Sequence, residues 1–274
     1  MTTTTLTAYI GSILMLITSI TGCAATQHTT DHQPPLPSMR IYDLPVEVDG
    51  QEYACKVMVS EHAQLGGPAL LFLHGSGECG TDGVRQTHVG LPRYAMEHPE
   101  MWPFVLIVPQ KPSVNSEWED HEEALMLMLD QAAEMGLFDP DRLAITGLSQ
   151  GGHGTITIAS LHPERFKAAA PVCGYVRSVF NDDGVRMPRT PTTADTPEVI
   201  ESAKRLSLMP TWIHHGGADS VVPVTESRSL HQALVRLNAE TLYSEYPGVD
   251  HNSWDNAYID QELSDWFAEQ LDAD

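Results

Sequence analysis

The chain has 274 residues, of which 42% are hydrophobic and 19% charged, and its formal net charge is −22. This composition is typical of a globular protein, and the length is sufficient for one α/β domain with a sizeable core. The negative charge argues against nucleic acid as a partner, because phosphate binding needs clusters of Lys and Arg.

The first thirty residues contain no charged side chain and include the short apolar run "AYIGSILMLITSI". The run is too short for a transmembrane helix and is typical of the core of a secretory signal. It ends in "ITGC", which resembles the lipobox of bacterial lipoprotein signals, although the usual positive charges before it are missing. The resemblance implies a signal peptide over residues 1–22, cleavage before Cys23 and lipid attachment to its sulfur. An ordinary signal peptide and an uncleaved anchor are the alternatives.

Residues 23–37 are polar and contain proline, which predicts a tether between that anchor and the folded domain. We therefore expect an exported protein that faces the periplasm or the cell exterior and meets the membrane only through a lipid on Cys23. Of the other cysteines, Cys55, Cys79 and Cys173, at least one must stay unpaired, and none has a metal-ligand spacing. We predict no structural zinc and no cofactor.

The chain from residue 38 onward begins with "MRIYDLPVEV" and "EYACKVMVS", which predict an antiparallel hairpin that turns at Asp49 and Gly50. Short apolar runs follow, as in buried parallel strands: "ALLFLHG", "FVLIVPQ", "LAITGLS", "FKAAAPVCG", "TWIHHGG" and "TLYSEYPG". Helical patterns lie between and after them, in "DHEEALMLMLDQAAEMG", "VTESRSLHQALVRLNAE" and "AYIDQELSDWFAEQL". Residues 38–274 are therefore predicted to form one α/β domain, a mostly parallel sheet with helices on both faces, which binds ligands at the carboxyl ends of its strands.

The stretch "LAITGLSQGGHGT" runs from a predicted strand directly into a predicted helix. Its Gly147-x-Ser149-x-Gly151 pattern therefore lies where a nucleophile elbow requires it. The two glycines let the strand and the helix approach closely, and the sharp turn exposes the serine hydroxyl. A plain glycine turn is the alternative to this catalytic interpretation.

A serine needs a base, and the elbow predicts an acid and a histidine later in the chain. Asp219 in "WIHHGGADSVVP" and His251 in "YPGVDHNSWD" follow predicted strands in that order. Asp182 or Asp183 is the alternative acid. Asp250 is not expected to orient the neighbouring histidine ring.

Two backbone N–H groups are predicted to form an oxyanion hole. One belongs to Gln150, directly after the serine. The other belongs to Ser76 in the Gly-rich loop "LFLHGSGECG", with Gly77 as the alternative and with His74 as a structural residue.

The substrate pocket is harder to predict. His153 is expected on its floor or packed in the core, Glu78 at its mouth or in solvent, and Trp118 and Trp254 beside the acyl or aryl group or in the core. The long segment 175–202 follows a core strand, so it is either a small cap over the pocket or a solvated insertion.

These motifs, taken in order from about residue 68 to the C-terminus, resemble the α/β-hydrolase superfamily. They are similar in particular to secreted esterases related to feruloyl esterases and polyhydroxybutyrate depolymerases, and to the "predicted peptidase" group with its phospholipase and carboxylesterase relatives. The resemblance implies Ser149 as nucleophile, Asp219 as acid and His251 as base. Gln150 and His153 depart from the pattern, where an apolar residue and an aromatic are expected, and this leaves the substrate open.

The favoured function is a serine carboxylesterase that acts through an acyl-enzyme on a small or polysaccharide-linked ester. A serine peptidase of prolyl-oligopeptidase type is the second hypothesis. The resemblance to such enzymes implies a large propeller domain before the hydrolase domain, whereas fewer than seventy residues precede the predicted core here. A non-catalytic surface protein with a hydrolase fold is the third hypothesis.

Overall fold

The computed structural model describes residues 39–181 and 185–272. The expected signal peptide, Cys23, the tether and the alternative acids Asp182 and Asp183 lie outside the described residues. The strands are β1 (Arg40–Asp43), β2 (Val46–Val48), β3 (Gln51–Tyr53), β4 (Cys55–Val59), β5 (Ala69–Leu73), β6 (Val105–Pro109), β7 (Leu143–Leu148), β8 (Ala169–Val172), β9 (Thr211–Gly216) and β10 (Thr241–Tyr246). The α-helices are α1 (Gly90–Glu97), α2 (Glu122–Glu134), α3 (Gln150–Leu161), α4 (Pro197–Leu206), α5 (Thr225–Arg236), α6 (Trp254–Tyr258) and α7 (Gln261–Asp272).

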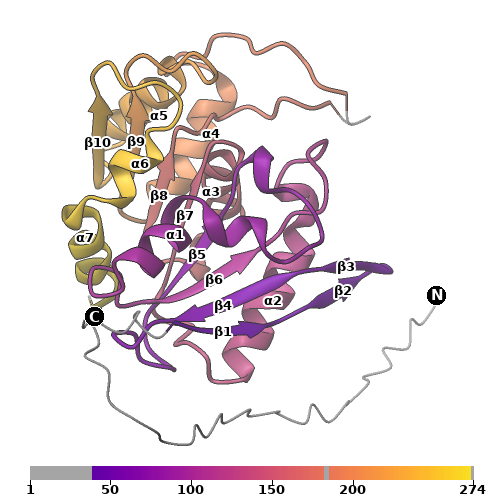
Figure 1. The fold of residues 1–274 in the computed structure, drawn as a ribbon. Coiled ribbons are helices and arrows are strands. Elements are labelled where there is room, and N and C mark those ends of the chain that lie inside the picture. The colour runs from indigo at the N-terminus through magenta and orange to yellow at the C-terminus, as the bar shows by residue number, and fades with distance from the viewer. Residues whose placement is uncertain (1–38, 182–184, 273–274) are drawn as a thin grey trace, which may run out of the picture. The chain divides into compact units, whose positions relative to one another are not determined.

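Eight strands form one sheet in the order β1-β4-β6-β5-β7-β8-β9-β10 (Figure 1). The six strands from β6 to β10 in this order run parallel, whereas β1 and β4 join antiparallel at one edge. The strand–helix alternation of the sequence therefore gives the predicted mostly parallel sheet. The carboxyl ends of the parallel strands meet at one rim, and the loops at that rim carry the predicted site residues.

The N-terminal hairpin forms as expected. Strands β2 and β3 pair antiparallel with Val48 opposite Gln51. The two turn residues between them, Asp49 and Gly50, have φ of 51° and 79°. Two successive positive φ values match the right-handed twist of the flanking strands, which explains why an Asp-Gly pair occupies this turn.

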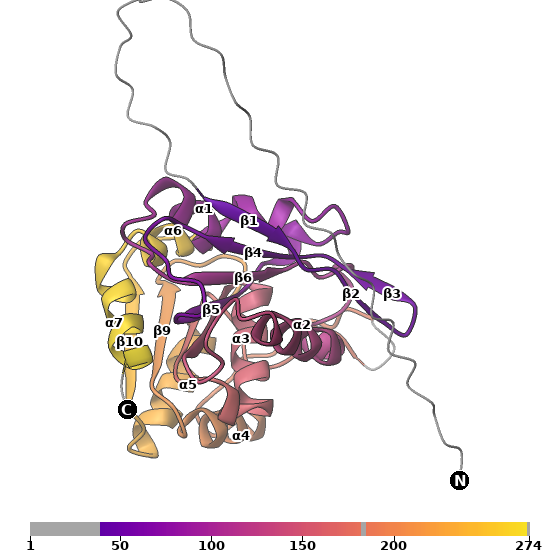
Figure 2. The same cartoon turned by 90° about the horizontal axis from the view of Figure 1, so that it is seen from below.

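Helices cover both faces of the sheet (Figure 2), and the strand side chains alternate between two cores. In β5, Ala69, Leu71 and Leu73 pack into the core under α2, α3, α4 and α5, whereas Leu70 and Phe72 pack into the core under α1, α6 and α7. Strands buried on both faces explain the uninterrupted apolar runs of the sequence. None of the described helices is long and apolar enough to cross a bilayer.

The last helical pattern differs from the simplest expectation. The pattern "AYIDQELSDWFAEQL" forms two helices, α6 and α7, because Asp260 lies between them and its carboxylate accepts the N–H of Glu262 at 3.0 Å. Asp260 thus acts as a local cap at which the chain begins a new helix in a new direction.

The described cysteines are free thiols, and burial raises the pKa of Cys55 to about 12.

Candidate active site

The chain turns sharply between β7 and α3, and Ser149 is the residue at the turn. Its backbone has φ of 56° and ψ of −114°, a conformation that non-glycine residues rarely adopt. The turn is held on both sides, because the Ser149 N–H donates to the carbonyl of Val172 at 2.9 Å and the His153 N–H donates to the carbonyl of Ser149 at 3.0 Å. Strain of this kind persists only where the surrounding structure fixes it, and it is typical of functional sites.

The glycines around Ser149 have direct steric reasons. A Cβ on Gly151 would lie 1.9 Å from the carbonyl oxygen of Leu73, and a Cβ on Gly147 would lie 2.5 Å from the same oxygen. Strand β5 and helix α3 therefore approach so closely that neither position accepts a side chain. The GxSxG spacing follows from this contact between backbones.

The serine, histidine and aspartate that the sequence singles out lie in one hydrogen-bonded line. His251, in the loop between β10 and α6, has its Nε2 atom 2.9 Å from Ser149 Oγ. Its Nδ1 atom lies 2.7 Å from Oδ2 of Asp219, which follows β9. The three residues come from separate loops at the carboxyl ends of β7, β9 and β10, which is the arrangement that nucleophilic serine chemistry needs.

Asp219 is a fully buried carboxylate with several donors. The backbone N–H groups of Val221 and Val222 each donate to it at 2.8 Å, and a second histidine, His215, lies with its Nε2 atom 3.2 Å from Oδ2. Burial by itself would raise the pKa of Asp219, but the hydrogen bonds from His215 and His251 outweigh burial and hold that pKa well below its usual range. Asp219 therefore remains a charged acceptor for the His251 ring at neutral pH.

Asp250, the neighbour of His251, serves the loop instead of the ring. Its carboxylate accepts the backbone N–H and hydroxyl of Ser220 and the backbone N–H of His251, all at 2.7–2.8 Å for Oδ1. The expectation that Asp250 does not orient the histidine ring is consistent with these contacts.

The loop after β5 places Ser76 beside Ser149. Ser76 begins a short 3₁₀ turn, Ser76–Glu78, and lines the same cavity as Ser149 and Gln150. Gly77 does not line that cavity. A Cβ on the preceding Gly75 would come within 3.5 Å of the Ser149 side chain, so the loop backbone passes directly over the serine.

His74 holds this loop in place. The N–H of Lys111 donates to His74 Nε2 at 2.9 Å, so the ring proton lies on Nδ1, which donates to the carbonyl of Gly75 at 2.6 Å. Burial lowers the pKa of His74 to about 3, so the ring is neutral. His74 is thus a structural residue of the loop.

Two residues expected near the substrate lie elsewhere. The prediction that Trp118 flanks the substrate is wrong, because its side chain is 1% exposed and packs on Gly154, where a Cβ would lie 2.6 Å from the indole ring. The packed alternative holds for His153, which is 1% exposed and stacks under Tyr175 with 4.5 Å between ring centroids. Gly154 leaves the space that the tryptophan fills.

His153 forms an ion pair with Glu119, with 3.0 Å between Nε2 and the carboxylate, in which the histidine is buried and the glutamate partly exposed. Burial opposes a charge on His153, but the Glu119 carboxylate outweighs it and raises the pKa of His153 to about 9. The protonated ring donates its other N–H to the Tyr175 carbonyl at 2.8 Å. His153 therefore fixes Tyr175 from below and does not form the floor of the cavity.

The remaining two pocket candidates border the site without lining the cavity next to Ser149. Trp254 starts α6 and meets the His251 ring edge-on, with 5.6 Å between ring centroids. Glu78 is half-buried in the loop after β5, and burial raises its pKa. Trp254 supports the histidine, and Glu78 lies against Gly75.

The cavity next to Ser149 has a volume of about 80 Å³. Most of its lining residues were not among the individual residues predicted for the site: Val114, Tyr175, Val179, Phe180, Arg186, Arg189 and Val221. Five of these belong to the segment 175–202, so the described part of that segment shapes the cavity as a cap would. Its later part begins helix α4 at Pro197. The one available signal was its position directly after a core strand at the rim.

Glu117 ties the elbow to that segment. Its buried carboxylate accepts the Gln150 side-chain amide, the Tyr175 hydroxyl and the Val179 N–H, at 3.0–3.1 Å. Gln150 also donates to the carbonyl of Ser116 at 2.9 Å. The polar side chain of Gln150, unusual at this position, is therefore part of a structural network behind the cavity.

Residues 115–274 match the prolyl oligopeptidase family. Three curated relatives share 25–28% of their residues with the chain in the matched regions. An uncharacterized secreted protein of Arthroderma benhamiae is 25% identical over 67% of this chain and 21% of its own length. A probable dipeptidyl-aminopeptidase B of Sordaria macrospora is 28% identical over 54% of this chain and 17% of its own length. A probable carboxylic ester hydrolase of Mycobacterium tuberculosis is 26% identical over 51% of this chain and 39% of its own length. The chain thus spans about a sixth to two fifths of the length of these relatives.

Solved structures share the fold. A thermostable esterase is 28% identical and superimposes with a TM-score of 0.66 over 84% of this chain and 62% of its own. A ferulic acid esterase from the anaerobic fungus Anaeromyces mucronatus is 15% identical. It superimposes with a TM-score of 0.60 over 89% of this chain and 93% of its own, which shows a common fold. The family match extends over more than half of the chain and includes Ser149, Asp219 and His251. The chain has the α/β-hydrolase fold and belongs to the prolyl oligopeptidase family.

Proposed function

We propose that this protein is a serine carboxylesterase that hydrolyses carboxylic esters through an acyl-enzyme. The observation that carries the proposal is the hydrogen-bonded line from Asp219 through His251 to Ser149, next to a cavity at the rim of the sheet. Ser149 is the nucleophile, His251 the general base and Asp219 the acid that holds the histidine tautomer.

The mechanism follows from these positions. His251 Nε2 takes the hydroxyl proton as Ser149 Oγ attacks the ester carbonyl, and Asp219 stabilises the imidazolium that forms. The N–H groups of Gln150 and Ser76 stabilise the oxyanion of the tetrahedral intermediate. The imidazolium then gives its proton to the leaving alcohol, and a water molecule repeats the sequence on the acyl-enzyme.

An ester substrate has support from two relatives. The 28% identical solved structure is named as an esterase, and the Mycobacterium tuberculosis relative as a probable carboxylic ester hydrolase. Peptide hydrolysis is the second candidate, because the family takes its name from an oligopeptidase and the Sordaria macrospora relative is named as a dipeptidyl-aminopeptidase. Both reactions use the same serine chemistry, so the choice depends on the substrate alone.

The deciding experiment compares three substrates on the purified protein: p-nitrophenyl acetate, a feruloyl ester and a peptide anilide. We expect turnover of the esters, together with fluorophosphonate labelling that the Ser149→Ala variant loses. Turnover of the anilide alone would replace the esterase with a peptidase. Labelling that survives Ser149→Ala would remove Ser149 as the nucleophile, and no labelling of the native chain would favour a non-catalytic surface protein.

Export remains part of the proposal. The Arthroderma benhamiae relative is named as a secreted protein, and the lipobox-like "ITGC" supports lipid attachment at Cys23. Expression of the full chain in a bacterium with radiolabelled palmitate tests this, because label should enter the native protein and be absent from Cys23→Ser. Unlabelled native protein in the medium would instead indicate an ordinary signal peptide.

A further inference from the structure

The cavity next to Ser149 carries a charge opposite to that of the chain. The sequence has 37 acidic and 15 basic residues. Among the described residues that line this cavity, however, the charged side chains are two arginines, Arg186 and Arg189, and none is Asp or Glu. Apolar and aromatic side chains make up most of the remaining wall.

Arg186 and Arg189 also differ from most other arginines in their partners. Within residues 39–181 and 185–272, neither has a carboxylate within ion-pair distance, whereas the common arrangement is a salt bridge, as in Arg177 with Glu198, Arg228 with Glu245 and Arg236 with Asp195. In a strongly acidic protein, arginines beside a nucleophile that lack carboxylate partners indicate that an anion of a bound ligand forms their ion pair.

Both arginines are held toward the site by structure. Arg189 lies over the Tyr175 ring, with its guanidinium carbon 4.0 Å from the ring centroid. The ring is itself fixed by His153, which stacks on it, and by the hydrogen bonds of its hydroxyl to Glu117. A cation on a fixed aromatic platform loses little conformational freedom when it binds a ligand.

Arg186 projects from a short antiparallel arm. The N–H of Met187 donates to the carbonyl of Val179 at 2.7 Å, and Phe180 stands opposite Arg186. Directly opposite residues of an antiparallel pair have their side chains on the same side, and both Phe180 and Arg186 line the cavity. The arm therefore brings an aromatic group and a cation together beside Ser149.

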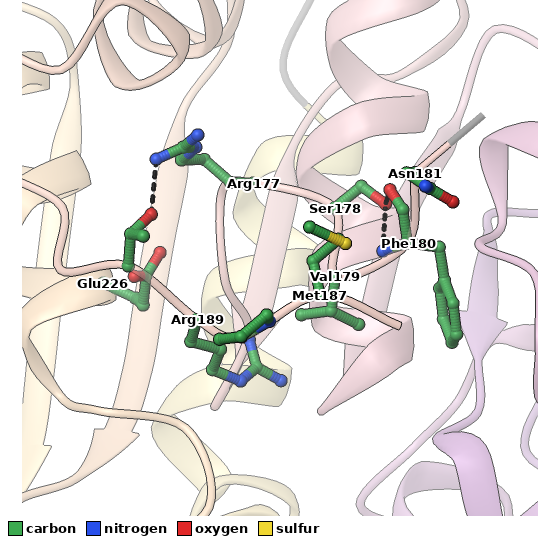
Figure 3. Close-up of a pocket in the computed structure, with 10 residues that line it drawn as sticks. Arg177, Ser178, Val179, Phe180, Asn181, Met187, Arg189 and Glu226 are labelled. Carbon is green, nitrogen blue, oxygen red and sulfur yellow. Dashed lines mark hydrogen bonds between the residues drawn. The ribbon is translucent and has the colours of Figure 1, made fainter. Parts of the chain in front are cut away.

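Arg189 also lines a second, larger cavity of about 290 Å³ (Figure 3). Val179 and Phe180 are shared by the two cavities as well. In the larger cavity Arg177 is paired with Glu198 and bonded to Thr190, and Glu226 accepts the Val176 N–H. Arg189 is thus a cation at the boundary between the small cavity and the large one, with no carboxylate partner in the part of the chain that the structure describes.

We propose that Arg189, assisted by Arg186, binds an anionic group of the substrate, a carboxylate in its simplest form, so that the enzyme prefers esters that carry a negative charge. This inference rests on the proposed esterase function and specifies its substrate class. The carboxylate can belong to the acyl group or to the alcohol, and the guanidinium groups bind both with the same chemistry.

Two substrate pairs separate these sources. Monophenyl adipate is compared with the phenyl ester of adipamic acid, which tests a charge on the acyl side. For the alcohol side, 4-acetoxybenzoate is compared with 4-acetoxybenzamide. In each pair the carboxylate is replaced by an amide of nearly the same shape, so that the ratio of the two kcat/KM values reports charge recognition.

Arg189→Met keeps an unbranched stem over Tyr175 and removes the charge, whereas Arg189→Lys keeps the charge. We expect the native enzyme to prefer the anionic member of at least one pair, and Arg189→Met to reduce that preference roughly 10- to 100-fold, as for a lost charge-assisted hydrogen bond. Arg189→Lys should restore part of it, and Arg186→Met should show a smaller loss. The matched control is Arg205→Met, an exposed residue of α4 paired with Glu201, which changes the net charge equally and should keep the preference.

A measurement without ester turnover separates this inference from the esterase proposal. Adipate should protect Ser149 of the native protein from a fluorophosphonate better than adipamide does, and Arg189→Met should abolish the difference. Protection without hydrolysis of any ester would overturn the esterase function and keep the anion site. Ester hydrolysis with no charge preference in either pair and no selective protection would overturn the anion site, as would an equal loss for both members of a pair in Arg189→Met.

Discussion

The side-chain amide of Gln150 donates a 3.0 Å hydrogen bond to the buried carboxylate of Glu117. The same carboxylate accepts the Tyr175 hydroxyl and the Val179 N–H from the segment that walls the cavity. One buried acid thus connects the first residue of α3, directly after Ser149, to side chains that line the cavity. A buried group with several donors rigidifies its surroundings as long as all its partners remain satisfied.

Glu117→Gln replaces one acceptor oxygen with an amide N–H donor. At least one of the groups that donate to Glu117 then faces this new donor and loses its hydrogen bond. We expect a loss of about 1–3 kcal/mol in the free energy of unfolding. We also expect kcat to fall on the order of tenfold or more, because small displacements at a reacting centre are costly. Urea unfolding and steady-state kinetics measure the two effects. Glu123→Gln, at an exposed position of α2, is the control and should change neither. An unchanged kcat in a destabilised Glu117→Gln variant would limit Glu117 to a structural role.

Asp219→Asn tests the acid. The amide keeps an acceptor for the N–H groups of Val221 and Val222 but favours the wrong tautomer of His251, so we expect kcat to fall roughly 10⁴-fold with little change in KM. Asp250→Asn is the matched control, since Asp250 contacts Ser220 and the His251 backbone and not the ring. A larger loss in Asp250→Asn than in Asp219→Asn would reverse the assignment.

Gly151→Ala tests the contact that forms the turn at Ser149. The new methyl group would lie 1.9 Å from the Leu73 carbonyl oxygen, so strand and helix must separate. We expect a large destabilisation, of about 4 kcal/mol or more, with loss of ester hydrolysis and of fluorophosphonate labelling. A Cβ on Gly77 meets nothing within 4 Å, so Gly77→Ala should leave the free energy of unfolding within about 0.5 kcal/mol of the native value. Equal thermal stability of the two variants would contradict the steric argument.

The His153–Glu119 pair predicts a pH dependence of stability. The pKa of His153 is raised to about 9 in the folded chain, above the value of roughly 6.5 for an unfolded histidine. The folded state therefore binds more protons between these pH values, and stability falls as the pH rises. The contribution of the pair is fully present below about pH 6.5 and lost as the pH passes about 9.

Urea unfolding at about pH 6 and about pH 9.5, on either side of this window, measures the loss. Glu119→Gln should reduce the difference between the two pH values, because the partner that raises the His153 pKa is gone. Glu122→Gln, which removes the partner of the more exposed His162, is the control and should retain the native pH dependence. A pH dependence that is the same in Glu119→Gln as in the native chain would contradict the role of the pair.

The sequence could predict the sheet and the positions of Ser149, Asp219 and His251, because each depends on local patterns. Buried strands read as apolar runs, and residues directly after them gather at one rim. The β2–β3 hairpin was equally predictable, since Asp49 and Gly50 adopt positive φ values, which aspartate tolerates and glycine adopts freely.

The pocket could not be predicted in the same way, because its walls come from loops whose side chains are oriented by distant partners. Trp118 packs inward only because Gly154, on another element, has no side chain. Tyr175 faces the cavity because Glu117 and His153 hold it from behind. Gly154 itself was a signal for the buried indole, but a glycine next to a sharp turn is just as compatible with the turn alone, so it does not point to a tryptophan more than thirty residues away.

The strained backbone of Ser149 is fixed by the sheet and α3, whereas the cation-bearing wall belongs to a separate segment after β8. The proposed nucleophile and the wall that we propose selects the substrate therefore belong to different parts of the chain. Grafting another sequence onto residues 175–190, with Glu117 and the groups that donate to it retained, should redirect the enzyme to a new ester while the serine keeps its reactivity.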